Sequence, residues 1–269
     1  MISLHLSTIS KGAADLARRH GLGIEIAEYS YAVNMDSNFA HWEGITRDNL
    51  LGITNRIFHA PYSELCPASA DPLIVEVSRQ RLDQAYKIMR YFDINRMVVH
   101  SGYVPHLHHE DWFIGRSVAF WQDFLHEKSD DFSLLLENVM EESPEMLCEI
   151  IEKTDDTRFQ LCLDIGHAGR ASSQASITHW IKATAPYFGH VHIHNNYRMS
   201  DLHNPPGEGL IDMELVLTKI IELQHSTTFT AETTKCESAI AWFEINGFLP
   251  ASDTELQLTN VQHNAQRFL

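Results

Sequence analysis

The chain of 269 residues is poor in cysteine and has no long apolar runs. Its four cysteines show no CxxC spacing and are too few for a disulfide framework, so we expect reduced thiols. No stretch approaches the roughly 18 consecutive apolar residues of a membrane span. Residues 1–16 lack the basic and apolar regions of a secretory signal. These absences predict a cytoplasmic protein with no membrane partner.

Positive charge is also scarce, with 20 basic against 36 acidic residues and a formal net charge of −16. Proteins that bind along DNA neutralise its phosphates with Lys and Arg, so we do not expect extended DNA binding here. The chain has instead 17 histidines. A histidine-rich acidic chain is better suited to binding metal ions than to tracking nucleic acid.

Strand-like and helix-like segments alternate along the whole chain, which predicts a parallel sheet. The strand candidates are 2–8, 23–29, 56–61, 96–101, 133–138, 159–165, 190–195 and 228–233, and the clearest helix candidates are 73–93, 112–127, 144–153, 174–186 and 212–224. Eight units favour a closed (β/α)₈ TIM barrel, and no GxGxxG follows the first strand to support a dinucleotide-binding open sheet. We expect one domain over 1–269, with an irregular C-terminal tail at 248–269.

Three loops are longer than a minimal barrel needs: residues 30–55, 103–111 and 196–211. They follow the second, fourth and seventh strand candidates. All three should therefore lie on the C-terminal face, where barrel enzymes build their sites.

Side chains of the kinds that bind metals lie at, or just beyond, the ends of six apolar runs. They are His59, His100, Glu137, Asp164, His167, His192, Asp201, His203 and Glu232. A parallel barrel gathers its strand ends on one face, so these groups should converge. Their nitrogen and carboxylate donors suit Zn²⁺, with Mn²⁺, Fe²⁺ or Co²⁺ as alternatives, and nine donors would serve two or three ions.

Two local motifs carry four of these residues. Asp164 and His167 in LDIGH (163–167) can reach one metal centre, although Asp164 could simply cap the next helix. Asp201 and His203 lie in DLHNPPGEG (201–209), which its Pro and Gly residues stiffen. The alternative for this second motif is an ordinary surface turn.

The other candidates close apolar strands. Glu137 in LLLENV and Glu232 in FTAETT are costly there unless paired or bound to a cation, and a salt bridge at the barrel rim is the alternative. His59 and His100 could instead be hydrogen-bonded core histidines. His192 shares one side of its strand with His194, so the alternation leaves both open as ligands.

Seven motifs resemble the xylose isomerase-like TIM-barrel superfamily (AP endonuclease family 2), which unites endonuclease IV with sugar isomerases and epimerases. They are HAPY (59–62), VVHSG (98–102), LEN (136–138), LDIGH (163–167), HVHIHNN (190–196), DLHNPPGEG (201–209) and AETT (231–234). The resemblance runs from about residue 20 to residue 235, and it favours His192 over His194 as the ligand.

The endonuclease IV branch implies three zinc ions. The resemblance assigns His59, His100 and a bridging Glu137 to the first ion, Glu137, Asp164, His192 and Glu232 to the second, and His167, Asp201 and His203 to the third. The epimerase branch implies one ion on Glu137, Asp164, His192 and Glu232. In that branch Glu137 and Glu232 are the catalytic acid/base pair.

One position departs from the pattern of many relatives, because Asn195 stands where they carry an acidic residue. Our first functional hypothesis is a multinuclear zinc hydrolase of a small phosphoester. The alternative is a mononuclear sugar or sugar-phosphate isomerase or epimerase. Both act on a small molecule, and the sequence is compatible with a homodimer.

Overall fold

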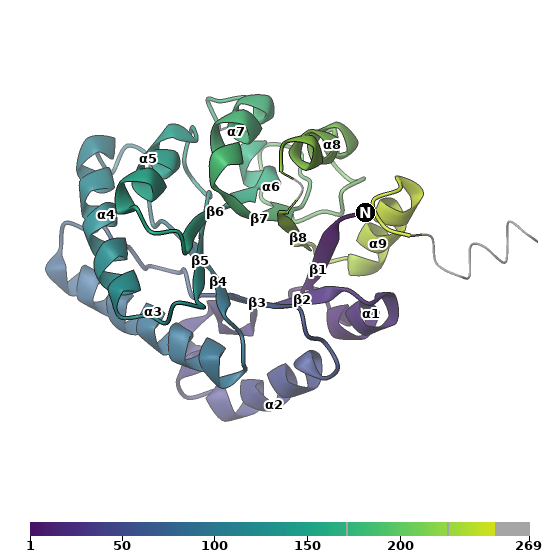
Figure 1. Ribbon diagram of the computed structural model, residues 1–269, viewed down its shortest axis with the longest axis horizontal. Coiled ribbons are helices and arrows are strands. Elements are labelled where there is room, and N and C mark those ends of the chain that lie inside the picture. The colour runs from purple at the N-terminus through teal and green to yellow at the C-terminus, as the bar shows by residue number, and fades with distance from the viewer. Residues whose placement is uncertain (171, 225, 251–269) are drawn as a thin grey trace, which may run out of the picture.

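The computed structural model describes residues 1–170, 172–224 and 226–250, and in it eight parallel strands close into a barrel in sequence order. The strands are β1 (Ser3–Ser7), β2 (Gly23–Ile26), β3 (Arg56–His59), β4 (Arg96–His100), β5 (Ser133–Glu137), β6 (Phe159–Asp164), β7 (Phe188–Ile193) and β8 (Thr228–Ala231). Figure 1 shows them as an inner ring surrounded by helices. Strand β1 also pairs with β8, which closes the ring and confirms the predicted TIM barrel.

Helices follow the strands around the outside of the ring. They are α1 (Ala13–His20), α2 (Phe39–Leu50), α3 (Pro72–Tyr91), α4 (Glu110–His126), α5 (Glu145–Thr154), α6 (Ile165–Ala168), α7 (Ile177–Thr184), α8 (Met213–Leu223) and α9 (Cys236–Ile245). Residues with known preferences for helix N-termini mark where several of these helices begin. Asp71 accepts a hydrogen bond from the Leu73 amide at the start of α3, and Pro72 occupies the first helical position.

The prediction of a long loop at 30–55 is wrong, because this segment contains α2. Two short 3₁₀ helices, Glu28–Ser30 and Ala32–Met35, precede it. Helix α2 fully buries only Thr46 and Leu50, so its sequence carries little helical periodicity. At the predicted tail, Phe248 and Leu249 are buried against the core, and residues 251–269 lie outside the described residues.

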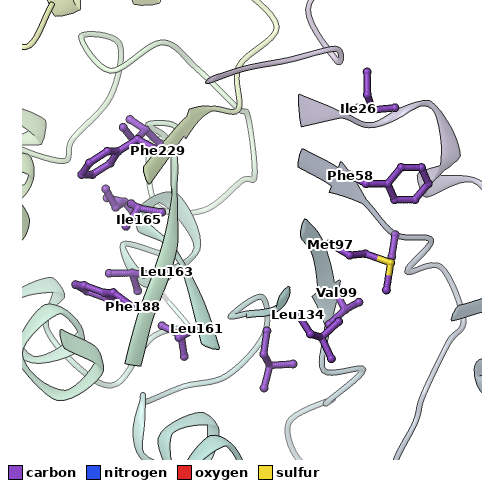
Figure 2. Close-up of a cluster of buried hydrophobic side chains, with 14 of the residues drawn as sticks. Ile26, Phe58, Met97, Val99, Leu134, Leu161, Leu163, Ile165, Phe188 and Phe229 are labelled. Carbon is purple, nitrogen blue, oxygen red and sulfur yellow. The ribbon is translucent and has the colours of Figure 1, made fainter. Parts of the chain in front are cut away.

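A large apolar cluster fills the space between the strands and the helices. Figure 2 shows part of it, with side chains such as Phe58 and Phe188 on the outer sides of opposite walls of the barrel. Side chains alternate along a strand, so the intervening residues point into the barrel. No helix of the described residues is both long and apolar enough to cross a membrane.

The barrel interior is apolar on one half and polar on the other. Ile57, Val98, Leu135 and Cys162, from β3 to β6, form a separate apolar cluster. The facing positions of β1, β2, β7 and β8 are His5, Glu25, His190 and Thr230, all fully buried. Barrel interiors are usually filled by layers of branched apolar side chains, so this polar half requires an explanation.

Candidate metal centre

The nine predicted side chains converge at the C-terminal end of the barrel. Strand pairing sets His100 beside Glu137 and Asp164 beside His192. Besides a cluster of Glu25, His190 and His192 inside the barrel, the nine side chains form, together with His194, three clusters in which the ligand atoms lie within 4.8 Å of one another. They are the central group (Glu137, Asp164, His192 and Glu232), the histidine pair (His59 and His100, with Glu137), and the loop-side group (His167, His194, Asp201 and His203).

The central group surrounds Nδ1 of His192. This atom lies 3.3 Å from Oε1 of Glu137 and 3.2 Å from Oε2 of Glu232. Oδ2 of Asp164 and Oε2 of Glu232 are buried without a hydrogen-bond partner. Buried carboxylate oxygens are costly unless a proton donor or a cation satisfies them, so this donor set fits a divalent ion.

The histidine pair contacts the other oxygen of Glu137. Oε2 lies 3.3 Å from Nε2 of His59 and 3.2 Å from Nε2 of His100. Nδ1 of His59 donates to the Ala60 carbonyl at 2.9 Å, which leaves Nε2 directed at the carboxylate. Glu137 therefore stands between the pair and the central group, where a bridging carboxylate would stand.

The loop-side group joins β6 and β7 to the segment that follows β7. Nε2 of His167 donates to Oδ2 of Asp201 at 2.9 Å, and Nε2 of His203 lies 3.5 Å from Oδ1. Nδ1 of His167 donates to the Asn138 carbonyl, and Nδ1 of His203 donates to the Glu232 carbonyl, both at 2.9 Å. Such outer hydrogen bonds fix the tautomer and turn Nε2 of each ring toward the group.

The geometry of Asp164 is compatible with both of the roles that the sequence left open. Its Oδ1 accepts the His167 amide at 2.6 Å and so caps α6. Its Oδ2 remains for the central group. The amide side chain of Asn138 accepts the Asp164 N–H and donates to its carbonyl, at 2.8 and 3.0 Å, which fixes the backbone of this residue.

Burial and opposite charge set the pKa values in the centre. Burial would raise the pKa of Glu137, but His192 and His100 hold it well below its usual range. Burial would lower the pKa of His167 and His203, but nearby carboxylates, above all Asp164 and Asp201, raise it to about 10 and about 9. His167 and His203 are thus both positively charged at neutral pH in the metal-free protein.

Sequence reasoning missed Glu25, which supports His192 from below. Oε1 of Glu25 lies 3.0 Å from Nε2 of His192, and Oε2 accepts a hydrogen bond from Thr230 at 2.6 Å. His190 and His192 hold the pKa of Glu25 well below its usual range despite complete burial. The sequence signal for Glu25 is a glutamate inside the apolar run GIEI, whereas the predicted ligands lie at or beyond the ends of such runs.

A cavity of about 570 Å³ opens above the three groups. Glu137, Glu232, His167, Asp201 and His203 line its polar side. Segments after β3, β4 and β5 supply an apolar side that includes Ile74, Val104, Leu107 and Met140. None of the described lining residues is Lys or Arg.

Aromatic and histidine residues of the loops also reach the cavity. Tyr62 stacks on His100 with ring centroids 4.5 Å apart, and Tyr103 and His108 line the wall. Trp42 and Arg198 line other hollows of the surface.

Comparison with known proteins places the chain among TIM barrels. The uncharacterised protein MJ1311 of Methanocaldococcus jannaschii is 29% identical over 203 residues, which cover 70% of this chain and 68% of that protein. A solved D-tagatose 3-epimerase-like protein superposes with a TM-score of 0.74 and 22% identity, covering 97% of this chain and 99% of that one.

Two further structures share the fold at lower identity. The TTHB071 protein of Thermus thermophilus, from a crystal soaked with ZnCl₂, gives a TM-score of 0.72 at 21% identity, over 91% of this chain and 98% of that one. D-psicose 3-epimerase of Clostridium cellulolyticum H10, solved with D-tagatose, gives 0.69 at 13% identity, over 93% and 100%. The model of the xylose isomerase-like TIM-barrel family matches residues 14–245, and the chain belongs to that family.

Proposed function

We propose that this protein is an isomerase or epimerase that acts on a small sugar and depends on a divalent metal ion. The observation that carries the proposal is the central group, which brings Glu137 and Glu232 together at the cavity floor. Two solved structures with this fold are named as an epimerase or an epimerase-like protein, which adds support to the proposal. They favour this alternative over the zinc hydrolase, which no comparison supports.

Glu137 and Glu232 are the proposed acid/base pair. Both are almost completely buried, at 1% and 7% exposure, and both line the cavity. One carboxylate removes the proton from the carbon beside the sugar carbonyl, and the other, as the carboxylic acid, returns a proton to the deprotonated sugar and so forms the product. Asp164 and His192 would complete the set that holds the ion. When bound, the ion would polarise the carbonyl and hydroxyl oxygens of the sugar.

The cavity favours an unphosphorylated sugar over a sugar phosphate. Phosphate groups are usually recognised by Arg, Lys or helix N-termini, and no described lining residue is Lys or Arg. The apolar wall of Val104, Leu107 and Met140 suits the carbon face of a sugar or an apolar substituent on it.

Proton exchange with solvent tests this function. Metal-loaded protein incubated in D₂O with a panel of ketoses should place deuterium on the carbon beside the carbonyl of at least one of them. Glu137→Gln and Glu232→Gln should each lower the exchange by about 10²-fold or more.

Glu28→Gln is the matched control, because Glu28 is also a buried glutamate but bonds to Thr8 and Asn49 away from the cavity floor. It should retain exchange. No deuterium uptake from any ketose or aldose, with metal bound, would rule out the proposal.

A phosphoester hydrolase remains a second candidate because of the histidine pair. Glu137 contacts both this pair and the central group, an arrangement that a single-ion epimerase does not need. Zinc-loaded protein that hydrolyses bis(p-nitrophenyl) phosphate, and loses this activity on His100→Asn, would favour the hydrolase. If the protein is an epimerase, it should leave this ester intact.

A further inference from the structure

We propose that His194 joins His167, Asp201 and His203 as the fourth ligand of a separate metal site, whose ion has protein ligands at all four positions and none left for substrate. From the sequence alone, His194 is only an alternative to His192 as a metal ligand. The family resemblance assigns three ligands to this ion, which would leave its fourth coordination position without a protein ligand. The structure fills that position from β7.

His194 is directed into the loop-side group. The side chain is fully buried, and neither ring nitrogen has a hydrogen-bond partner. Nε2 lies 3.8 Å from Oδ1 of Asp201 and 3.0 Å from Oδ1 of Asp164, and the ring stacks on that of His203 with centroids 4.2 Å apart. Neither contact of Nε2 has hydrogen-bond geometry, and a buried imidazole without a hydrogen bond is costly, so a metal ion would satisfy it.

The spacing of the four side chains suits a tetrahedral ion. Zinc bonds to nitrogen and oxygen are about 2.0–2.1 Å long, so ligand atoms lie roughly 3.3 Å apart around such an ion. The distances from Asp201 oxygens to the three Nε2 atoms are 2.9, 3.5 and 3.8 Å, which span that value. Three imidazoles and one carboxylate make a borderline-soft set that favours Zn²⁺ over Mg²⁺ or Ca²⁺.

The backbone around His194 is adapted to hold its ring. A Cβ at Gly166 would lie 2.0 Å from Cε1 of His194, so only glycine at this position of α6 leaves space for the ring. The central group does not recruit His194, because His192 fills that place from the preceding inward position of β7. Alternating inward side chains of one strand thus serve two different sites.

Four protein ligands change the role expected of this ion. Catalytic zinc keeps an open position for water or substrate, whereas four protein ligands are typical of structural zinc. This ion would fasten the segment 195–212, through Asp201 and His203, to His167 after β6 and His194 after β7. The inference does not depend on the proposed sugar chemistry.

Cobalt spectroscopy tests the coordination directly. Co²⁺-loaded wild-type protein should show the intense visible absorption of four-coordinate cobalt, and His194→Asn should lose it. In a competition titration, the loop-side site of the variant should also bind Zn²⁺ about 10-fold or more weakly than the same site of the wild-type protein. His5→Asn is the matched control, since His5 is a buried, inward-facing histidine that donates to the Phe229 carbonyl outside all three groups.

An unchanged spectrum and unchanged zinc affinity in folded His194→Asn would overturn the proposal. If this variant does not fold, azide is added to Co²⁺-loaded Glu137→Gln protein, because this substitution removes the carboxylate that the central group and the histidine pair share, and azide binds only to an ion with an open position. The four-coordinate band should persist with azide. A shift of that band would show an open site and would equally overturn the proposal.

Discussion

His192 is held by carboxylates at both ring nitrogens. Nδ1 faces Glu137 and Glu232, and Nε2 faces Glu25. Metal-binding histidines usually donate their second N–H to a carboxylate or carbonyl, which fixes the ring and increases its basicity. In this arrangement Glu25 would act through His192 as a positioning residue, and the polar half of the barrel interior lies below the candidate metal centre.

Removing the charge of Glu25 should therefore weaken metal binding without removing a ligand. We expect Glu25→Gln to lower the affinity of the central group for its ion about 10–100-fold, as measured by calorimetric titration. Glu28→Gln should leave the affinity unchanged. Equal affinities in Glu25→Gln and wild type would contradict the role assigned to Glu25.

The raised pKa values of His167 and His203 predict how stability depends on pH in the metal-free protein. A histidine whose pKa rises on folding adds stability that is fully present below about 6.5, its unfolded value. That stability is lost as the pH rises through about 9 and about 10, the folded values. The melting temperature of metal-free protein should thus fall by several degrees between pH 7 and pH 10.

Circular dichroism melts at pH 7, 8.5 and 10 measure this fall. Zinc-loaded protein should show a smaller fall, because the ion requires neutral histidines. His203→Asn should reduce the slope in the metal-free protein. A metal-free melting temperature that does not change between pH 7 and pH 10 would show that these protons do not stabilise the fold.

The segment between β7 and α8 is organised by Asn195. Its amide donates to the carbonyls of Pro206 and Ile211, and its Oδ1 accepts the N–H groups of Asn196 and Ile211. Its backbone forms an antiparallel bridge with Asn204. An acidic side chain could not donate these bonds, which gives a physical reason for the departure from the family pattern at this position.

Asn195→Asp should consequently be destabilising. It replaces two buried donors with a buried negative charge, at a cost of about 1–3 kcal/mol or more. For a chain of this length, 1 kcal/mol corresponds to roughly 2–4 °C in melting temperature.

Thermal melts of the variant beside Asn55→Asp check this, because Asn55 is exposed at the opposite end of the barrel. Metal content should also fall in Asn195→Asp, since Asp201 and His203 lie within the segment. A variant as stable as wild type would mean that the network does not hold the loop.

At the scale of the whole molecule, closure of the barrel brings together groups that are far apart in the sequence. Glu25 and His192 are 167 residues apart, and both lie inside the same ring. The chain carries a formal net charge of −16, and the described cavity lining has no Lys or Arg side chain. A small neutral substrate can enter such a site, whereas a polyanion is repelled.

We therefore expect no binding of duplex DNA at physiological ionic strength. Fluorescence anisotropy of a labelled duplex of about 20 base pairs should not change up to micromolar protein, with or without Zn²⁺. Non-specific DNA binders reach dissociation constants of about 10⁻⁴–10⁻⁶ M by neutralising phosphates. Saturable binding in that range, weakened by salt, would reveal a basic surface outside the described cavity.

The sequence by itself determined the barrel and the identity of most candidate ligands. Alternating apolar segments of two periodicities specify strands and helices, and polar groups such as His59, Glu137 and Glu232 stand out where apolar runs end. These are local signals, so they can be read without coordinates. The same rule missed α2, whose weakly apolar face carries little periodicity.

Only the tertiary structure decided which side chains act together. Alternation along the strand predicts that His192 and His194 lie on the same side. Only the geometry of the closed barrel shows that His192 belongs to the central group and His194 to the loop-side group. Glu25 lies within an apolar run, and only barrel closure revealed its partner. Metal sites are made by distances across the fold, and those distances depend on how all eight strands close.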